Sequence, residues 1–153
     1  NIGIQGEELN KVVDYALDQV KMKEFADRPP HHLSFGQRRR VAVATVLAMK
    51  PDILVLDEPS SNLDPASRRE LAEILLNLDV TIFMVTHDLP YALEICPRAA
   101  ILNNGKIVAD GITRDLLAMK SDESNRLELL WHAFRPHPTS QIEIYELHKK
   151  KLN

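Results

Sequence analysis

Two adjacent acids, Asp57 and Glu58, follow the unbroken apolar run 53–56 in the middle of the chain. Such a run is typical of a strand in a parallel α/β sheet that is covered on both faces. Ligands of these sheets bind at the carboxyl ends of the strands. Because neighbouring strand residues point to opposite sides, one acid can hold magnesium through water while the other orients or deprotonates an attacking water. Ordinary surface acids at a strand–helix junction are the alternative interpretation.

The predicted helix start at Ser34 is a second candidate site. Ser34 and Gln37 have the spacing of a capping box. A hydroxyl and free backbone N–H groups at a helix start favour an anion, and a donor aimed at developing charge in a dry site contributes ~3 kcal/mol. An ordinary helix cap is the alternative. The positive charges of the three arginines 38–40 near a helix start are unfavourable with the helix dipole. Such locally unfavourable choices are expected at functional sites. A solvated basic face is the alternative interpretation of these arginines.

His87 follows a second predicted buried strand, 80–85. If the two strands are neighbours in the sheet, His87 lies beside the acids and can hydrogen-bond a terminal phosphate or an attacking water. A structural role is the alternative for a single histidine. The pair His31 and His32 has no further ligand at the spacing of a metal site, and we expect it to be structural.

The elements that must position these residues are predicted from apolar periodicity, helix caps and turn residues. An N-cap at Asp64 followed by Pro65 marks one helix start, and Asn104-Gly105 is a strong hairpin turn. We expect helices over 7–20, 34–48, 64–78, 89–96, 113–119, 124–134 and 141–151, and strands over 53–56, 80–85, 99–102 and 106–109.

The length, composition and net charge of the chain restrict the class of protein. The 153 residues are enough for one ordinary domain with a real core, and 44% hydrophobic with 27% charged residues predicts a soluble globular chain. The net charge of −3 gives no electrostatic reason to expect a nucleic-acid partner. A single cysteine, Cys96, excludes an internal disulfide and fits a reducing compartment. The chain begins at Asn1 rather than at methionine, and we expect a processed product or a fragment.

Four segments together resemble the ATPase domain of ABC transporters, in its C-terminal half only. The segment 33–37 (LSFGQ) is similar to the signature motif, 53–58 to Walker B, 61–64 to the D-loop, and His87 to the switch histidine. The amino-acid sequence of residues 26–34 is also similar to that of the cobalt/nickel and energy-coupling-factor importers. The resemblance implies an α/β fold, with a partial P-loop NTPase-type parallel sheet and part of a helical subdomain.

The resemblance also implies roles for single residues. Asp57 would bind Mg²⁺ through water, Glu58 would be the general base, and His87 would contact the γ-phosphate of ATP. The signature residues would close in trans on ATP held by a second subunit, and a D-loop aspartate would couple the two sites. The residues of these two ATP-contacting motifs are Ser34, Phe35, Gly36, Gln37 and Asp64. Phe35 stands where the family usually has glycine, and its bulk restricts how closely the backbone approaches a phosphate unless the side chain points away.

The Gly-rich phosphate cradle of the family, G-x-x-x-x-G-K-[ST], is absent. Without this Walker A half, we expect weak ATP binding, negligible hydrolysis by the chain alone, and an open sheet edge with exposed apolar surface. The implied organisation is 1–32 as part of the helical subdomain, 33–119 as the core half, and 120–153 as a C-terminal extension. The implied partners are a second ATPase subunit and an integral membrane permease, with a peripheral position on the cytoplasmic face of the membrane.

The resemblance leaves several functions open. The leading hypothesis is an ATPase that drives import, with a transition-metal ion or a vitamin as the candidate cargo. The alternatives are a non-catalytic module that completes a partner's site through the signature surface, a truncated inactive fragment, and a non-transport ABC ATPase from DNA repair or chromosome maintenance. No coiled-coil or zinc insertion typical of the last class is present in the sequence.

Overall fold

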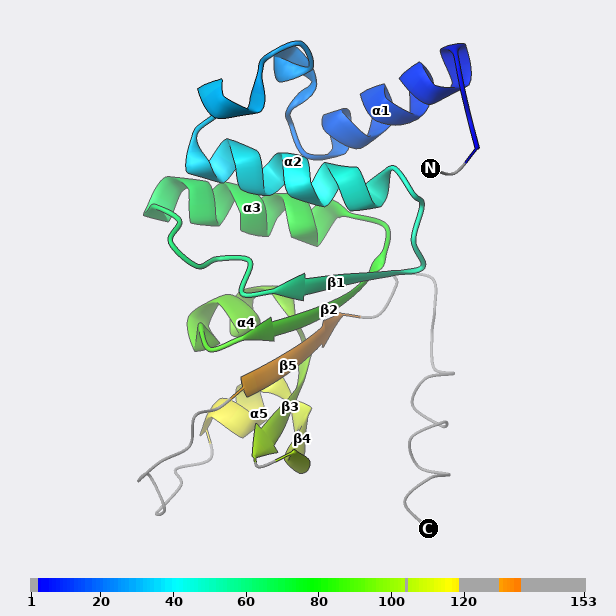
Figure 1. Cartoon of the computed structure of the whole chain (residues 1–153). Coiled ribbons are helices and arrows are strands. Elements are labelled where there is room, and N and C mark those ends of the chain that lie inside the picture. Colours follow the sequence, from blue (N-terminus) through cyan, green and yellow to red (C-terminus); the bar gives the residue numbers. More distant parts are fainter. Residues whose placement is uncertain (1–2, 104, 119–129, 136–153) are drawn as a thin grey trace.

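The computed structural model describes residues 3–103, 105–118 and 130–135 (Figure 1). The α-helices are α1 (Glu7–Gln19), α2 (Phe35–Leu47), α3 (Pro65–Asn77), α4 (Leu89–Ile95) and α5 (Thr113–Ala118), with short 3₁₀ turns at Lys23–Phe25 and Pro30–His32. The strands are β1 (Ile53–Asp57), β2 (Thr81–Thr86), β3 (Arg98–Asn103), β4 (Lys106–Ile112) and β5 (Leu130–Arg135). The predicted helices up to residue 118, the two predicted buried strands that became β1 and β2, and the hairpin are all present, with ends that differ by a few residues.

The five strands form one sheet in the order β1-β2-β5-β3-β4. β1 and β2 are parallel, and α3 forms the crossover between them, as the predicted α/β fold requires. β5 is antiparallel to both of its neighbours, β2 and β3, and β3 and β4 form the antiparallel hairpin. Helices α1, α2 and α3 are stacked in succession on the β1 side of this sheet (Figure 1).

Local sequence accounts for the starts of the two helices that carry site residues. Ser34 and Gln37 form the predicted capping box at the start of α2, with each side chain accepting from the other's backbone N–H. Asp64 caps α3 by accepting from the backbone N–H groups of Ala66 and Ser67, and Pro65 occupies the first helical position. Both caps are therefore decided by residues within one helical turn.

One main apolar core joins the helices to the first two strands. Its buried residues come from α1, α2, α3, β1, β2 and α4. Leu54 of β1 and Ile82 and Met84 of β2 are completely buried in it, as is Leu75 of α3. Because this core fixes the two parallel strands against α3 and α4, it also fixes the segments that follow the strands at their carboxyl ends.

The expectation that β1 is covered on both faces is wrong for the described residues. Ile53 and Val55 are 52% and 63% exposed, whereas Leu54 between them is fully buried. The face of β1 opposite the core is therefore exposed, and β1 is in addition an edge strand of the sheet. The open edge and exposed apolar surface predicted for a domain without its first half are therefore present.

The predicted helix over 124–134 is also wrong in its final part, because Leu130–Arg135 is strand β5. The register pairs Val85 of β2 with His132, and Ala100 of β3 with the same residue. Hydrogen bonds to two strands outweigh the helical periodicity of this short segment, which is an example of tertiary context overriding local preference. Residues 124–129 and the predicted helix 141–151 lie outside the described residues.

In the part of the chain that the structure describes, no helix combines the length and the apolar character needed to cross a bilayer.

Candidate functional site

The carboxyl ends of β1 and β2 bring the predicted acids and histidine together. The parallel register pairs Asp57 with Val85, so Glu58, which follows β1, lies at the level of Thr86, which ends β2, and of His87, which follows it. The backbone N–H of Glu58 donates to the carbonyl of Val85 over 2.8 Å, which continues the strand pairing by one residue. The prediction that the two strands are sheet neighbours and place His87 beside the acids is confirmed.

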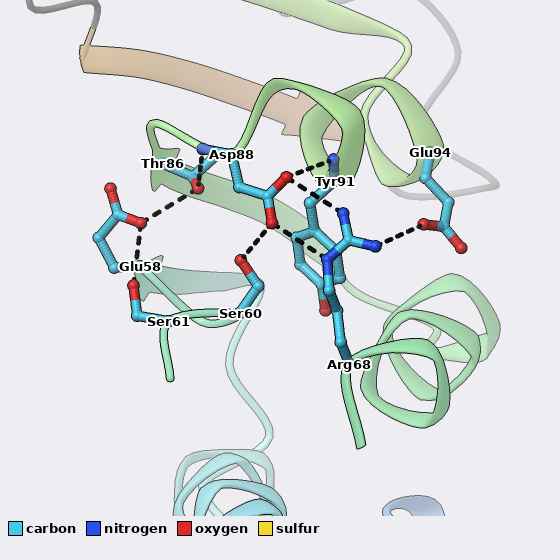
Figure 2. Close-up of polar contacts among 8 residues, drawn as sticks. All are labelled: Glu58, Ser60, Ser61, Arg68, Thr86, Asp88, Tyr91 and Glu94. Carbon is cyan, nitrogen blue, oxygen red and sulfur yellow. Dashed lines mark hydrogen bonds and ion pairs between the residues drawn. The ribbon is translucent and has the colours of Figure 1, made fainter. Parts of the chain in front are cut away.

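Glu58 is held by donors from both sides of its carboxylate. Its Oε1 accepts from the backbone N–H of His87 over 2.9 Å and lies 2.7 Å from His87 Nδ1. Its Oε2 accepts from Thr86 Oγ1 over 3.2 Å and from Ser61 Oγ over 3.3 Å, as Figure 2 shows for the two hydroxyls. A carboxylate offers about four lone-pair sites, so these donors engage most of its capacity.

The backbone of Glu58 leaves the strand conformation. Its φ is 44°, a left-handed value that costs about 1–3 kcal/mol for a residue with a Cβ. This conformation ends β1 and lets the side chain reach the segment after β2, where the contacts with Thr86 and His87 offset the cost. Asp57, still in the strand, and Glu58 thus occupy different environments. The reason is the turn of the backbone at Glu58 rather than the alternation of strand residues expected from the sequence.

Two opposing effects set the pKa of Glu58. Partial burial raises the pKa of the carboxyl, while the hydrogen bonds from His87 and Thr86 lower it, and the net pKa lies below the usual 4.5. Glu58 is therefore ionised at neutral pH. An ionised carboxylate accepts protons and cannot donate one, so the site suits a group that orients water or takes a proton from it.

Asp57 ends β1 with an exposed side chain. Among the described residues, no hydrogen bond or ion pair engages its carboxylate, and no group of three or more His, Cys, Asp or Glu side chains has the arrangement of a metal site. Mg²⁺ keeps several waters and is bound through one or two carboxylates together with substrate phosphates. A single free carboxylate beside the Glu58–His87 pair fits that preference, so the donor set is compatible with Mg²⁺.

The start of α2 presents an exposed polar surface. Ser34 Oγ accepts from Gln37 N over 3.2 Å, and Gln37 Oε1 accepts from Ser34 N over 2.8 Å. The capping box satisfies these two N–H groups and leaves those of Phe35 and Gly36 without an intrahelical partner. The surface can therefore donate backbone hydrogen bonds to an anion that reaches it from outside.

Gly36 and Asp64, which belong to different motifs, are connected through Ser67 of α3. A Cβ added to Gly36 would lie 2.5 Å from Ser67 Oγ and 2.8 Å from Ser67 Cβ. Ser67 Oγ in turn donates to Asp64 Oδ2 over 2.6 Å, and this contact lowers the pKa of Asp64. Glycine is required here by the close approach of α2 to α3, a structural reason that the sequence motif alone does not reveal.

The arginines after the helix start have separate contacts. Arg40 is buried and its Nη1 lies 2.7 Å from Glu70 Oε1, so it joins α2 to α3. Arg39 Nη2 donates to the carbonyl of Glu58 over 3.4 Å, and Arg38 Nη1 donates to the carbonyl of Leu33 over 2.7 Å. The solvated-face interpretation therefore fails for Arg40, whose role is in packing.

Phe35 remains 45% exposed at the start of α2. Its ring lies 5.9 Å from the guanidinium of Arg38 and 5.7 Å from that of Arg39, both on the same helix. The ring is thus associated with its own helix, within the range of a cation–π contact.

An acid and a base that the sequence interpretation did not single out lie next to this site. Asp88 follows His87 and caps α4, and Arg68 of α3 forms two hydrogen bonds with it. Ser60 Oγ also donates to Asp88. The Asp88-Leu-Pro sequence is a recognisable helix cap, but nothing in the sequence connects it with Arg68, which lies 20 residues away.

A cleft of about 220 Å³ lies elsewhere, at the amino ends of β1 and β2. Its lining includes Tyr15 of α1, Pro51 before β1 and Val80 before β2. Because ligands of open α/β sheets bind at the carboxyl ends of strands, this cleft is separate from the candidate site.

Comparison with known families and proteins agrees with this geometry. Residues 4–94, more than half of the chain, match the family described as "AAA domain, putative AbiEii toxin, Type IV TA system". A putative ABC transporter ATP-binding protein of Streptomyces avermitilis is 72% identical over 128 residues, which cover 83% of this chain and 49% of that protein. An energy-coupling factor transporter ATP-binding protein of Carboxydothermus hydrogenoformans is 43% identical over 131 residues, covering 84% of this chain and 48% of that protein.

Solved structures lead to the same class. The structure of cbiO1 from Clostridium perfringens, described as part of the ABC transporter complex cbiONQ, matches with a TM-score of 0.71 and 35% identity, over 78% of this chain and 49% of that one. The fold and the site thus define a P-loop NTPase-type α/β domain. The chain belongs to the family of ABC transporter ATPases. It spans about half the length of the curated relatives it matches.

Proposed function

We propose that this chain supplies the Walker B, switch, D-loop and signature parts of an ABC-type ATPase that drives import. The observation that carries the proposal is the Glu58–His87 pair, 2.7 Å apart at the carboxyl ends of two parallel strands, with the free carboxylate of Asp57 beside it. The similarity to transporter ATP-binding proteins supports the same activity. An energy-coupling factor relative and the cbiO1 structure favour cobalt/nickel or vitamin import within that class.

In this proposal each residue acts on ATP and water in turn. Asp57 would hold Mg²⁺ through water, and the bound ion would neutralise charge on the phosphates. Glu58 is ionised and would orient the attacking water and accept its proton. His87, whose ring is exposed, would contact the γ-phosphate and keep Glu58 in place through Nδ1.

The signature surface at the start of α2 would act in trans. Ser34 and Phe35 are exposed and Gln37 is partly exposed, whereas Gly36 is buried against α3. We expect these four residues to close on ATP held by a second ATPase subunit. Asp64, at the start of the adjoining helix α3, would couple the two sites of that dimer. An integral membrane permease would complete the assembly, and the chain would lie peripherally at the cytoplasmic face of the membrane.

The domain assignment is part of the same proposal. Residues 1–32 would belong to the helical subdomain, 33–119 to the C-terminal half of the ATPase core, and 120–153 to an extension, of which 130–135 pairs with β2 and β3 as strand β5. The sequence contains no G-x-x-x-x-G-K-[ST] segment, so the phosphate cradle must come from another polypeptide segment. Most of the phosphate-binding free energy in P-loop sites comes from that cradle and its lysine.

Hydrolysis measurements test the proposal. Phosphate release would be measured for the purified chain alone and for the chain mixed with an ABC ATPase domain that carries the Walker A motif. We expect negligible activity alone and activity in the mixture, with Glu58→Gln lowering that activity by about 10²–10⁴-fold. Glu7→Gln, the same chemical change at an exposed position of α1, is the matched control and should leave it unchanged.

Two other outcomes distinguish the alternatives. A mixture whose activity survives Glu58→Gln but is lost with Ser34→Arg would identify a non-catalytic module that acts through the signature surface. A mixture with no activity above that of the partner would identify an inactive fragment. Activity of the chain alone that disappears with Glu58→Gln would overturn the account of the missing cradle.

A further inference from the structure

A two-point contact joins α3 to the segment after β2. Arg68 Nε lies 3.0 Å from Asp88 Oδ2, and Arg68 Nη2 lies 3.1 Å from Asp88 Oδ1 (Figure 2). Both side chains are only 27% exposed. A bidentate arginine–carboxylate pair fixes orientation as well as distance, because the planar guanidinium matches the carboxylate plane. Asp88 is therefore held in one orientation from the side of α3.

The same carboxylate joins two further segments. Ser60 Oγ, in the loop after β1, donates to Asp88 Oδ2 over 3.1 Å, and the backbone N–H of Tyr91 in α4 donates to Oδ1 over 3.0 Å. Asp88 thus connects α3, the loop after β1 and the start of α4. These donors outweigh the effect of partial burial and keep the pKa of Asp88 below its usual 3.8.

A short path leads from Asp88 to the proposed base. The backbone N–H of Asp88 donates to Thr86 Oγ1 over 3.0 Å, and Thr86 Oγ1 donates to Glu58 Oε2 over 3.2 Å. His87, between these two residues, contacts the other oxygen of Glu58 with its backbone and its ring. The orientation of the turn 86–88 therefore determines the three contacts of Glu58 with Thr86 and His87.

Arg68 also contacts two side chains of α4. Its guanidinium lies 4.8 Å from the centre of the Tyr91 ring, which is fully buried, and its Nη1 lies 3.9 Å from Glu94 Oε2. Within the described residues, Arg68 forms no hydrogen bond or ion pair with Glu58 or His87. Among the described residues, the hydrogen-bonded path from Arg68 to that pair runs through Asp88.

We propose that Arg68 is a positioning residue that acts through Asp88 to hold the turn 86–88 so that His87 and Thr86 engage Glu58. This rests on the proposed function, in which Glu58 and His87 perform the chemistry, and it assigns a role to two residues outside the motifs. Losing Arg68 leaves Asp88 with fewer donors and lets the turn rotate, which separates the His87 ring from Glu58.

Nuclear magnetic resonance of the full chain tests the positioning role without ATP. The ¹⁵N shift of His87 Nδ1 reports its hydrogen bond to Glu58; the signal would be assigned with His87→Gln, and Glu58→Ala would give its position with the bond absent. We expect Arg68→Met to move the signal most of the way to the Glu58→Ala position. Arg68→Lys keeps the positive charge but not the planar guanidinium that forms both hydrogen bonds, and it should move the His87 signal part of the way.

Matched controls separate positioning from a general loss of stability. Arg69→Met makes the same change at the exposed neighbouring residue of α3 and should leave the His87 signal in place. Asp88→Asn should move the signal, and adding Arg68→Met to it should move it little further, because both act along one path. An unmoved His87 signal in Arg68→Met, with reduced stability towards urea, would overturn the proposal and leave a structural contact only. If Arg68→Met does not fold, the His87 signals of Arg68→Lys and Arg69→Lys are compared instead. A signal that moves only in Arg68→Lys would support the proposal, and a signal that moves in neither variant would overturn it.

Hydrolysis in the mixed assembly gives a second readout. A misplacement of about 1 Å in a reacting group lowers the rate up to about a hundredfold, so we expect Arg68→Met to lower kcat by about tenfold or more with KM nearly unchanged. A rise in KM with unchanged kcat would contradict the positioning role. Absence of hydrolysis with the unaltered chain would count against the proposed function alone, because the resonance measurement does not depend on activity.

Discussion

Two regions contain predicted site residues: the carboxyl ends of β1 and β2, and the start of α2. The contacts that hold these two regions differ. Glu58, Thr86, His87 and Asp88 contact one another across two strands and are held further by α3. The side chains of Ser34 and Gln37 hydrogen-bond to each other's backbone N–H groups within one turn of α2, and Ser34 is exposed. The first region is preorganised within this chain, whereas the second has a local cap and depends on something outside the chain for any role.

The largest effect on folding stability is expected in the first region. Asp88→Ala removes an acceptor used by Arg68, Ser60 and the N–H of Tyr91, and should lower the free energy of unfolding by about 3 kcal/mol. Urea unfolding followed by circular dichroism measures this. A loss no greater than that of Ser34→Ala would remove the contrast between the two regions.

A change at Gly36 tests the close contact between the start of α2 and the neighbouring helix α3. Gly36→Val puts a branched side chain against Ser67 at distances that no ordinary contact allows, and should cost about 2 kcal/mol. Unfolding of the Gly36→Ala variant, alone and with Ser67→Gly, gives the coupling. A cost for Gly36→Ala that is the same in both backgrounds would contradict the steric explanation.

Loss of the local cap should have a smaller effect. Ser34→Ala removes the acceptor for Gln37 N and should cost about 1 kcal/mol, while Ser34→Gly should cost about 0.3 kcal/mol. The same unfolding experiment measures both. Equal costs for the two substitutions would show that the serine side chain does not act as a cap, and the exposed region would then lack even its local organisation.

Acid should weaken the first region selectively. The pKa of Asp88 is lowered in the folded chain because the hydrogen bonds from Arg68, Tyr91 and Ser60 outweigh its burial, so its contribution to stability is present above the usual value of 3.8 and is lost as the pH falls below that value. Stability measured from pH 6 to 3 should fall less steeply in Asp88→Asn than in the unaltered chain. Identical slopes would mean that Asp88 is not responsible.

The smallest effect is expected for Phe35→Ala. The ring is nearly half exposed and contacts arginines of its own helix, so its removal should change the free energy of unfolding by less than about 0.5 kcal/mol. The variant is nevertheless expected to alter hydrolysis in the mixed assembly, because Phe35 lies on the surface proposed to meet ATP. A stability loss above that of Ser34→Ala would place Phe35 in the folded core instead.

Sequence reasoning found the elements and the residues of the candidate site up to residue 118. The Ser34 and Asp64 caps, the acids after β1 and the position of His87 follow from patterns of a few residues, and the structure has each where it was expected. The roles of these residues in catalysis remain predictions. The helix over 124–134 was wrong where β5 forms, because that strand is stabilised by partners far away in the sequence.

The sequence by itself determined the caps, the helical and strand periods and the family motifs, since each depends on residues within one or two turns. Only the tertiary structure decided that Arg68 meets Asp88, that Gly36 lies against Ser67, and that one face of β1 is exposed. Those features depend on which elements become neighbours in the folded chain. Contacts between residues 20 or more positions apart are set by the packing of whole helices and strands, which no local pattern encodes.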